Sequence, residues 1–399
     1  MTALGFAATL LCLFVAAAAW TLAESGRDGV TSTKTASASV ASATTVVGGT
    51  GDDGSASNAA VPNTTVPGSA VPTTAVPTTA ATTTTVAPRP LTIVFGGDVH
   101  LDGPLAATLA RDPAALFDGL QPALAEADLA VINLETAVTT GGKPVDKQFT
   151  FRADPSIFTV LREAGVDVIA GANNHSIDYG PQGFADTLAH AAEASAPLIG
   201  VGMDAAAAYR PFSATIGGRR VAVLNATDVL DGQFVDSWTA TESKAGVASA
   251  KNTQRLLDEV RAARSAHDTV VVYLHWGVEA TTCPSGRQRD LAAALRDAGA
   301  DVVVGTHAHR VLSGGYLDDT YVHYGLGNLV FKTSSAEGRR TGLLRLTLDG
   351  RTVVGSEWLP ARIAADFTPG LLDGAEADAE RRLWDERRTC TDLNDAPVA

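Results

Sequence analysis

The sequence predicts an α/β fold in which a layered domain of mostly parallel sheets is flanked by helices. Short apolar runs alternate with helical stretches between residues 91 and 304, and this alternation is typical of parallel strands joined by crossover helices. Residues 302–304 are three consecutive valines, which indicates a strand that is buried on both faces. Beyond residue 320, strand patterns follow one another without helices, so antiparallel strands are expected there.

Two segments are expected to precede this domain. Residues 1–23 contain an uncharged apolar run that is long enough to span a bilayer, and we interpret it either as a transmembrane signal-anchor or as a cleaved signal peptide. Residues 24–90 contain no aromatic residue, leucine or isoleucine, so they predict a disordered stalk rich in threonine, proline and alanine. The protein is therefore expected in the cell membrane with an extracytoplasmic domain, or secreted if the first segment is removed.

The rest of the sequence predicts one large domain at residues 91–360, followed by a C-terminal helix and tail at residues 361–399. This length is sufficient to bury a sizeable core. The net charge is -14 and the sequence contains no basic run, which argues against a nucleic-acid partner.

Each strand of the domain is predicted from an apolar run, and each helix from a longer stretch of helix formers that often begins at a proline. In chain order, the first predicted elements are a strand at 91–95, a helix at 113–127, a strand at 128–132, a helix at 155–164, a strand at 166–169 and a helix at 181–195. A hairpin at 212–225, a helix at 251–267, a strand at 269–274, a helix at 287–298 and the strand at 302–304 follow. Strands at 321–324, 342–348 and 352–359 and a charged helix at 381–388 complete the domain.

Cys283 and Cys390 are the only cysteines beyond the N-terminal apolar run. In an extracytoplasmic protein an even number of cysteines favours a disulfide bond, while two free thiols are the alternative. Neither cysteine has a second cysteine or a histidine at the spacing of metal ligands, which argues against a cysteine metal site.

Residue types that bind metal ions gather where the predicted strands end. Five of the eight histidines lie at these ends, together with carboxylate and amide side chains. The complete set is Asp98, His100, Glu135, Asn174, His175, His275, His307 and His309. The other three histidines, His190, His267 and His323, fall within predicted helices or strands and are interpreted as structural. Gly305 is expected to let the chain turn sharply before the His-x-His pair.

This set of ligand types suits divalent zinc, manganese or iron. There are enough ligands for two ions, and two ions that lie close together need a carboxylate that bridges them. Glu135 is the best candidate for that bridge. The ions would bind an anionic substrate oxygen and lower the pKa of a water molecule, which becomes the nucleophile. A neighbouring imidazole would then act as general acid.

The order and spacing of these residues resemble the calcineurin-like metallophosphoesterase superfamily and, more specifically, the bacterial capsule synthesis protein CapA family, which is linked to poly-γ-glutamate capsules. The resemblance covers about residues 91–332 and implies a metallophosphoesterase-like layered α/β domain. It rests on the blocks Gly-Gly-Asp-Val, Asn-Leu-Glu, Asn-Asn-His-x-x-Asp-Tyr-Gly, His-Trp-Gly-x-Glu, Gly-Thr-His-x-His and Tyr-Gly-Leu-Gly-Asn-Leu-Val-Phe.

The resemblance implies a role for each residue of the set. The first metal ion would be held by Asp98, His100 and His309, and the second by Asn174, His275 and His307. Glu135 would bridge the two ions, and His175 would be the proton donor. Ligand-orienting roles are implied for Asn133, Asp178 and Glu279. An anionic substrate could be met by Arg287, Arg289 and Arg310, although the first two could equally lie on a solvated helix face.

Three positions depart from the family patterns. Glu135 replaces the bridging aspartate of the superfamily, Ser176 stands where phosphoesterases usually carry an acid, and His100 stands where CapA relatives often carry an apolar residue. The implied function is a metal-dependent hydrolase or transferase at the cell surface that acts on an anionic polymer such as poly-γ-glutamate, alongside a membrane-bound synthesis complex. The alternatives are a non-catalytic polymer-binding or assembly subunit and a generic secreted metallophosphoesterase.

Overall fold

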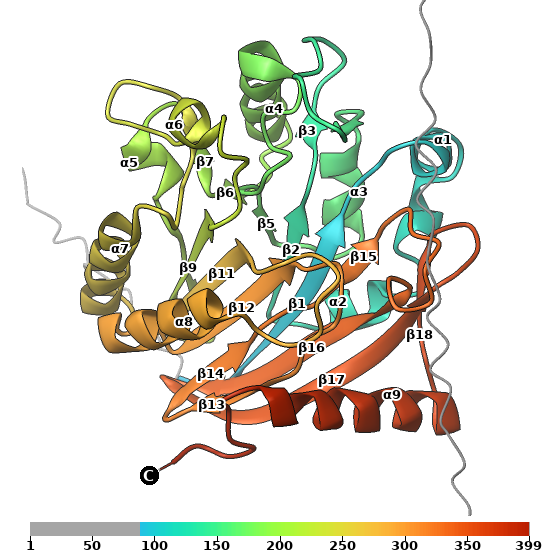
Figure 1. Ribbon diagram of the computed structural model, residues 1–399. Helices are drawn as coiled ribbons and strands as arrows, with labels where there is room; N and C mark the ends of the chain where they lie inside the picture. The colour runs from blue at the N-terminus through green and yellow to red at the C-terminus, as the bar shows by residue number, and fades with distance from the viewer. Residues whose placement is uncertain (1–87, 399) are drawn as a thin grey trace, which may run out of the picture. The chain divides into compact units, whose positions relative to one another are not determined.

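Two β-sheets pack face to face at the centre of the computed structural model, which describes residues 88–398 (Figure 1). The segment predicted to enter the membrane, residues 1–23, lies outside the described residues, as does nearly all of the predicted stalk. Within residues 88–398, no helix combines the length and the apolar character that crossing a bilayer requires.

The first sheet combines parallel and antiparallel strands. Its order is β18 (Pro369–Leu371), β17 (Thr352–Ile363), β16 (Arg340–Asp349), β1 (Leu91–Val99), β2 (Leu129–Leu134), β5 (Val168–Ala170) and β6 (Leu198–Ile199). A further strand, β15 (Asn328–Val330), pairs in parallel with the end of β1. The strands from β1 to β6 run parallel, whereas β16, β17 and β18 are antiparallel to their neighbours.

The second sheet also combines both directions. Its order is β13 (Gly314–Leu317), β14 (Thr320–His323), β12 (Val302–His307), β11 (Thr269–Trp276), β9 (Arg219–Thr227) and β8 (Phe212–Ile216). The strand predicted at 321–324 was expected to be antiparallel, but β14 runs parallel to β12 and antiparallel only to β13. The fold is therefore a layered α/β domain with mixed sheets, and the antiparallel pairing expected for 342–348 and 352–359 is confirmed by β16 and β17. The expectation for 321–324 was wrong because β13, which contains two glycines, was not recognised as a strand.

Alternating side chains on the strands build three of the four hydrophobic cores of the described residues. On β1, Ile93 and Phe95 point between the two sheets, while Val94 packs against the helices on the outer face. The helices over the first sheet include α1 (Pro104–Arg111), α2 (Gln121–Ala125), α3 (Ile157–Glu163) and α4 (Gly180–Glu193). The outer face of the second sheet is covered by α7 (Thr253–Ala266) and α8 (Gly286–Ala298) (Figure 1). The result is a four-layered arrangement of helices, sheet, sheet and helices.

Several short elements were not predicted from the sequence. They are the strands β3 (Ala137–Val138), β4 (Arg152–Ala153), β7 (Val201–Gly202) and β10 (Gly246–Val247), and the helices α5 (Ala205–Ala208), α6 (Val235–Trp238) and η2 (Arg388–Cys390), together with α1, β6, β15 and β18. A 3₁₀ helix, η1 (Pro113–Leu116), lies within a predicted helix. The continuous helix expected at 113–127 is in fact η1 and α2 with a break between them. The break brings Gly119 against β18, where an added Cβ would lie 2.4 Å from the carbonyl oxygen of Pro369.

The C-terminal region belongs to the same compact unit as the sheets. The boundary expected at residue 360 falls inside β17, and the helix expected at 381–388 begins earlier, as α9 (Gly374–Arg387). Trp384 of α9 is buried beside β17. A disulfide bond joins Cys283 to Cys390, so the first of the two alternatives for these cysteines holds.

Candidate metal site

The predicted ligands converge where the carboxyl ends of strands from both sheets meet. Asp98 of β1 lies opposite Asn133 of β2 in the first sheet, and Trp276 of β11 lies opposite His307 of β12 in the second. Tyr273 links the sheets here, because its hydroxyl donates a hydrogen bond of 2.6 Å to the carbonyl oxygen of Gly96. The metal-ligand types at the strand ends therefore form one cluster that spans the two sheets.

Two groups of side chains in this cluster are close enough to hold a metal ion. One group is Glu135, His307 and His309, and the other is Asp98, Glu135 and His275. Within each group, the ligand atoms all lie within 4.8 Å of one another. Glu135 is the member that the groups share, which is the position expected of a bridging carboxylate.

Asn174 lies against the second of these groups. Its Oδ1 atom is 2.8 Å from Nε2 of His275, and that nitrogen is 3.3 Å from Oε1 of Glu135. The rings of His275 and His307 have their centroids 4.7 Å apart. Asn174 and His275 are thus neighbours, as expected around the second ion. The two groups nevertheless divide the other ligands differently from the expectation, because His307 lies with His309 and Asp98 lies with His275.

His100, which was expected to ligate the first ion, does not belong to either group. Its Nε2 atom accepts a hydrogen bond of 2.9 Å from the backbone N–H of Lys332. The ring packs against Phe331 and Phe151 at centroid distances of 4.0 and 4.4 Å. Burial, together with the nearby His175, lowers the pKa of His100 to about 3, so this ring is neutral.

His175 faces the cluster from the turn that follows β5. Its Nε2 atom lies 3.9 Å from Oε1 of Glu135, and its Nδ1 atom lies 2.5 Å from Oδ2 of Asp178. Phe151 stacks on the ring with a centroid distance of 4.2 Å. Because one nitrogen is held by a carboxylate, the other is free to exchange a proton with a group bound at the cluster.

The buried polar atoms of the cluster fit bound cations. Glu135 is fully buried, and neither of its carboxylate oxygens has a hydrogen-bond partner. Nδ1 of His307 is also buried without a partner. Buried polar atoms are normally satisfied, and an isolated buried carboxylate is especially costly. Carboxylates and imidazoles are also the ligands that divalent zinc, manganese and iron prefer.

The surroundings shift the pKa values of three members of the cluster. Burial, aided by His275 and His309, lowers the pKa of His307 well below its usual value. Burial opposes protonation of His309 as well, but the carboxylates of Glu135 and Asp98 outweigh it and raise the pKa of His309 to about 9. The pKa of Asp98 is lowered because its hydrogen bond to His309 and the neighbouring His275 outweigh burial.

The His-x-His turn has an unusual backbone. His307 and His309 have φ angles of 90° and 51°, which residues other than glycine rarely adopt. Gly305 was expected to provide the turn, but it lies inside β12, which continues to His307. Its role is steric, because an added Cβ would lie 1.8 Å from Nε1 of Trp276.

Neighbouring side chains, Asn133 among them, form hydrogen bonds with the candidate ligands. The Nδ2 atom of Asn133 donates to Oδ1 of Asp98 at 2.8 Å and lies 3.2 Å from Nδ1 of His275. Asn328 was not predicted to take part, yet its Oδ1 atom lies 2.9 Å from Nδ1 of His309. The sequence signal that could have identified Asn328 is its place in the Gly-Leu-Gly-Asn part of the family motif, a block to which the sequence analysis assigns no role.

The segment between β3 and β4 contributes two further residues that were not predicted. Phe151 covers His175, and the ammonium group of Lys147 reaches the turn that carries His175. Of the three predicted arginines, Arg287 is paired with Asp228 and Arg289 donates to the backbone of Cys390. These two arginines are therefore engaged within the fold and away from the cluster.

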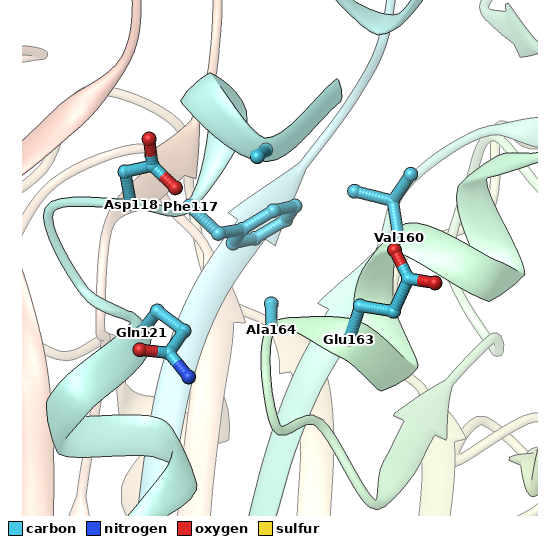
Figure 2. Close-up of a pocket in the computed structure, with 7 residues that line it drawn as sticks. Phe117, Asp118, Gln121, Val160, Glu163 and Ala164 are labelled. Carbon is cyan, nitrogen blue, oxygen red and sulfur yellow. The ribbon is translucent and has the colours of Figure 1, made fainter. Parts of the chain in front are cut away.

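A cavity of about 280 Å³ opens onto the cluster. Its walls combine ligand candidates with aromatic and charged side chains, namely His100, Asp102, Phe149, Phe151, His175, Glu279, His309, Phe331 and Lys332. A much smaller cavity of about 60 Å³ lies between η1, α2 and α3, where Phe117 faces Val160 and Ala164 (Figure 2). It contains none of the predicted site residues and is too small for a substrate.

Comparison with known proteins shows the family of this chain. The family described as "Bacterial capsule synthesis protein PGA_cap" matches residues 92–333. The chain is 32% identical over 237 residues to "PGA biosynthesis protein CapA" of Bacillus subtilis (strain 168), which covers 59% of this chain and 61% of that protein. It is 33% identical over 241 residues to "Capsule biosynthesis protein CapA" of Bacillus anthracis, covering 58% of this chain and 57% of that protein.

The matched region thus spans about 60% of the length of these relatives. Among solved structures, the 5'-nucleotidase from Candida albicans SC5314 covers 75% of this chain at 12% identity, with a TM-score of 0.43. That likeness is too weak to bear on the fold or the activity. The family match includes every residue of the candidate metal site. The chain therefore belongs to the bacterial capsule synthesis protein PGA_cap family.

Proposed function

We propose that this protein takes part in capsule or poly-γ-glutamate synthesis at the cell surface, where a dinuclear metal site acts on an anionic polymer by hydrolysis or transfer. Family membership supports the biological role. The observation that carries the chemistry is Glu135, a fully buried carboxylate that lacks hydrogen-bond partners and belongs to both ligand groups. A carboxylate in this state favours binding of cations.

The residues that would hold the two ions lie on either side of Glu135. They are Asp98, His275 and its neighbour Asn174 on one side and His307 and His309 on the other. When bound, divalent cations would polarise an anionic group of the substrate and lower the pKa of a water molecule. A phosphoester or an amide linkage of an anionic polymer is the class of bond that this chemistry cleaves or transfers.

The remaining groups of the cavity supply proton transfer and shielding. His175 would donate a proton to the leaving group through Nε2, because Asp178 holds the opposite nitrogen. Phe151 and Phe331 would limit the access of water to the cluster, which strengthens the interactions of charged groups inside it. Lys332, at the mouth, is the cation that would meet an anionic substrate first.

Metal content tests the site. Elemental analysis of the purified full-length protein is expected to find about two divalent ions per chain. His307→Ala/His309→Ala should lose them, whereas the matched double variant His190→Ala/His267→Ala should keep them, because those histidines lie outside the cluster. Equal metal content in the wild type and in the first double variant would overturn the proposed site.

The reaction is tested with the polymer itself. Incubation with poly-γ-glutamate, followed by gel electrophoresis of the polymer and detection of new chain ends, should show shortening or transfer when divalent metal is added. His175→Gln should abolish the change, and His190→Gln should not. A polymer that stays intact with metal-loaded wild type would argue against hydrolysis and transfer on this substrate.

One observation favours a second candidate, a non-catalytic subunit that binds polymer or assists a membrane-bound synthesis complex. Nε2 of His100, one of the expected ligands of the first ion, is taken by the backbone of Lys332. A site with fewer ligands would suit a structural ion. Metal-loaded protein that binds labelled poly-γ-glutamate, and whose binding survives His175→Gln without any turnover, would favour this candidate.

A further inference from the structure

Lys147 is a buried lysine that the proposed chemistry leaves without a role. Only 7% of its side chain is exposed. Lysine is rarely buried to this extent unless its charge is paired. The residue lies between β3 and β4, in a segment that contains none of the predicted ligands. Its burial beside the cluster therefore calls for a function.

The ammonium group of Lys147 contacts the turn that carries both a predicted metal ligand and the predicted proton donor. Nζ donates to the carbonyl oxygen of Asn174 at 2.5 Å and to Oδ1 of Asp178 at 2.9 Å. Asp231 lies at 4.0 Å, and the ring centroid of Trp238 at 5.3 Å. The donors of the ammonium group are therefore directed at the protein itself, so Lys147 is not placed to bind a substrate.

Asp178 receives hydrogen bonds on both of its oxygens. Lys147 donates to Oδ1, and the backbone N–H of Phe151 donates to Oδ2 at 2.7 Å. Nδ1 of His175 lies 2.5 Å from the same Oδ2 atom and 3.5 Å from Nζ of Lys147, so the carboxylate is its nearer partner. With both ends of the carboxylate held, Oδ2 presents a lone pair to the imidazole, which favours the tautomer that carries its proton on Nδ1.

We infer that Lys147 is a positioning residue that acts through Asp178 to fix the tautomer and the orientation of His175. The same ammonium group also anchors the backbone of Asn174, so one side chain aligns the proton-transfer group and a predicted metal ligand. This inference deepens the proposed function, because it rests on the role of His175 in proton transfer. The segment between β3 and β4 thereby becomes part of the site, although it supplies no ligand.

The fold supports this role through a further tie between the two segments. The backbone N–H of Val145 donates to the carbonyl oxygen of Asp178 at 2.9 Å. Val145, Lys147 and Phe151 thus contact the turn at three points within seven residues of sequence. These three contacts fix the position of Lys147 relative to the turn.

The test is the tautomer of His175, measured by long-range ¹H–¹⁵N correlation on full-length protein labelled with [¹⁵N]histidine and treated with EDTA. His175→Gln identifies the signals of this ring. In the wild type, the tautomer with the proton on Nδ1 should dominate. In Lys147→Met its ratio to the other tautomer should fall, because Oδ1 of Asp178 loses the donor that holds the carboxylate against the ring.

Two further variants make the result decisive. Lys244→Met is the matched control, because Lys244 lies near Trp238 but donates to the backbone of Asp236 and not to the site. It should keep the wild-type ratio. Lys147→Gln removes the charge but keeps a polar side chain. If Lys147→Met does not fold, the tautomer ratio is measured in Lys147→Gln instead. Its ratio should shift in the same direction.

An unchanged tautomer ratio in the folded Lys147 variants would overturn the inference, and so would an equal shift in Lys244→Met. The measurement is made without metal or substrate, so its outcome is separate from that of the proposed function. A protein that binds no metal but shows the shift would disprove the dinuclear site and leave the positioning role in place. A protein that binds metal but shows no shift of the tautomer ratio would disprove the positioning role and leave the dinuclear site in place.

Discussion

Replacing Glu135 by glutamine keeps the size of the side chain but removes the charge that both ligand groups share. In the structure this side chain is fully buried, and neither carboxylate oxygen has a hydrogen-bond partner. Oε1 lies 3.3 Å from Nε2 of His275 and 3.9 Å from Nε2 of His175. A neutral amide is a poor bridge between two cations. The variant is therefore expected to lose the stabilisation that bound metal gives to the folded state.

The size of this effect follows from binding. An ion present at a hundred times its dissociation constant stabilises the folded state by about 2.7 kcal/mol, so two ions contribute about 5 kcal/mol. In a domain of this size, that loss lowers Tm by on the order of 10 °C. Without metal and above pH 9, where His309 is neutral, Glu135→Gln should be at least as stable as the wild type, because a buried amide costs less than a buried carboxylate that lacks partners.

Differential scanning calorimetry of the full-length protein, in EDTA and then with added Mn²⁺ or Zn²⁺, measures both quantities. Glu163→Gln is the control, since this carboxylate lies beside the small cavity of Figure 2 and away from the cluster. Two results would refute the reasoning. One is metal stabilisation of Glu135→Gln equal to that of the wild type, and the other is a lower stability of this variant in EDTA above pH 9.

Three further predictions concern the fold. Gly305→Ala places a Cβ 1.8 Å from Nε1 of Trp276. Urea denaturation should therefore show a loss of ~3 kcal/mol or more in unfolding free energy. A variant as stable as the wild type would contradict this packing. Burial lowers the pKa of His323 to about 3, so the stability that depends on its neutral ring is present above pH 6.5 and is lost as the pH falls from 6.5 towards 3. His323→Gln should weaken this pH dependence of the unfolding free energy in urea, and an equal dependence in both proteins would show that other groups cause it. The disulfide between Cys283 and Cys390 spans a separation of 107 residues. Replacing both cysteines by serine should lower the unfolding free energy by about 4 kcal/mol, as measured by calorimetry without reductant. An unchanged Tm would contradict this contribution of the disulfide.

The metal cluster could be predicted because its residue types are informative and their positions are simple. Each ligand type follows an apolar run, and parallel strands bring such ends to one edge. His307 and Glu135 therefore met as expected, even though they belong to different sheets. The assignment of each strand to one of the two sheets was not predicted, because an apolar strand pattern does not show which neighbours the strand pairs with.

The roles of residues that depend on contacts with residues far away in the sequence could not be predicted from the sequence. Lys147 is indistinguishable from a surface lysine until the fold brings Asp178 to it. His100 fits a family motif by position, yet the backbone of Lys332 takes its Nε2 atom. Gly119 similarly looks like a tolerated glycine within a helix, and only its contact with β18 explains why the helix breaks there.

Glu135 is proposed to be shared by two bound metal ions. Anomalous X-ray diffraction from crystals of the protein grown with Mn²⁺ tests this proposal. Two anomalous peaks are expected, one on the side of His309 and one on the side of His275, with Glu135 within coordinating distance of both. The absence of a peak beside Glu135, or peaks only at surface carboxylates, would rule out a metal site shared through Glu135.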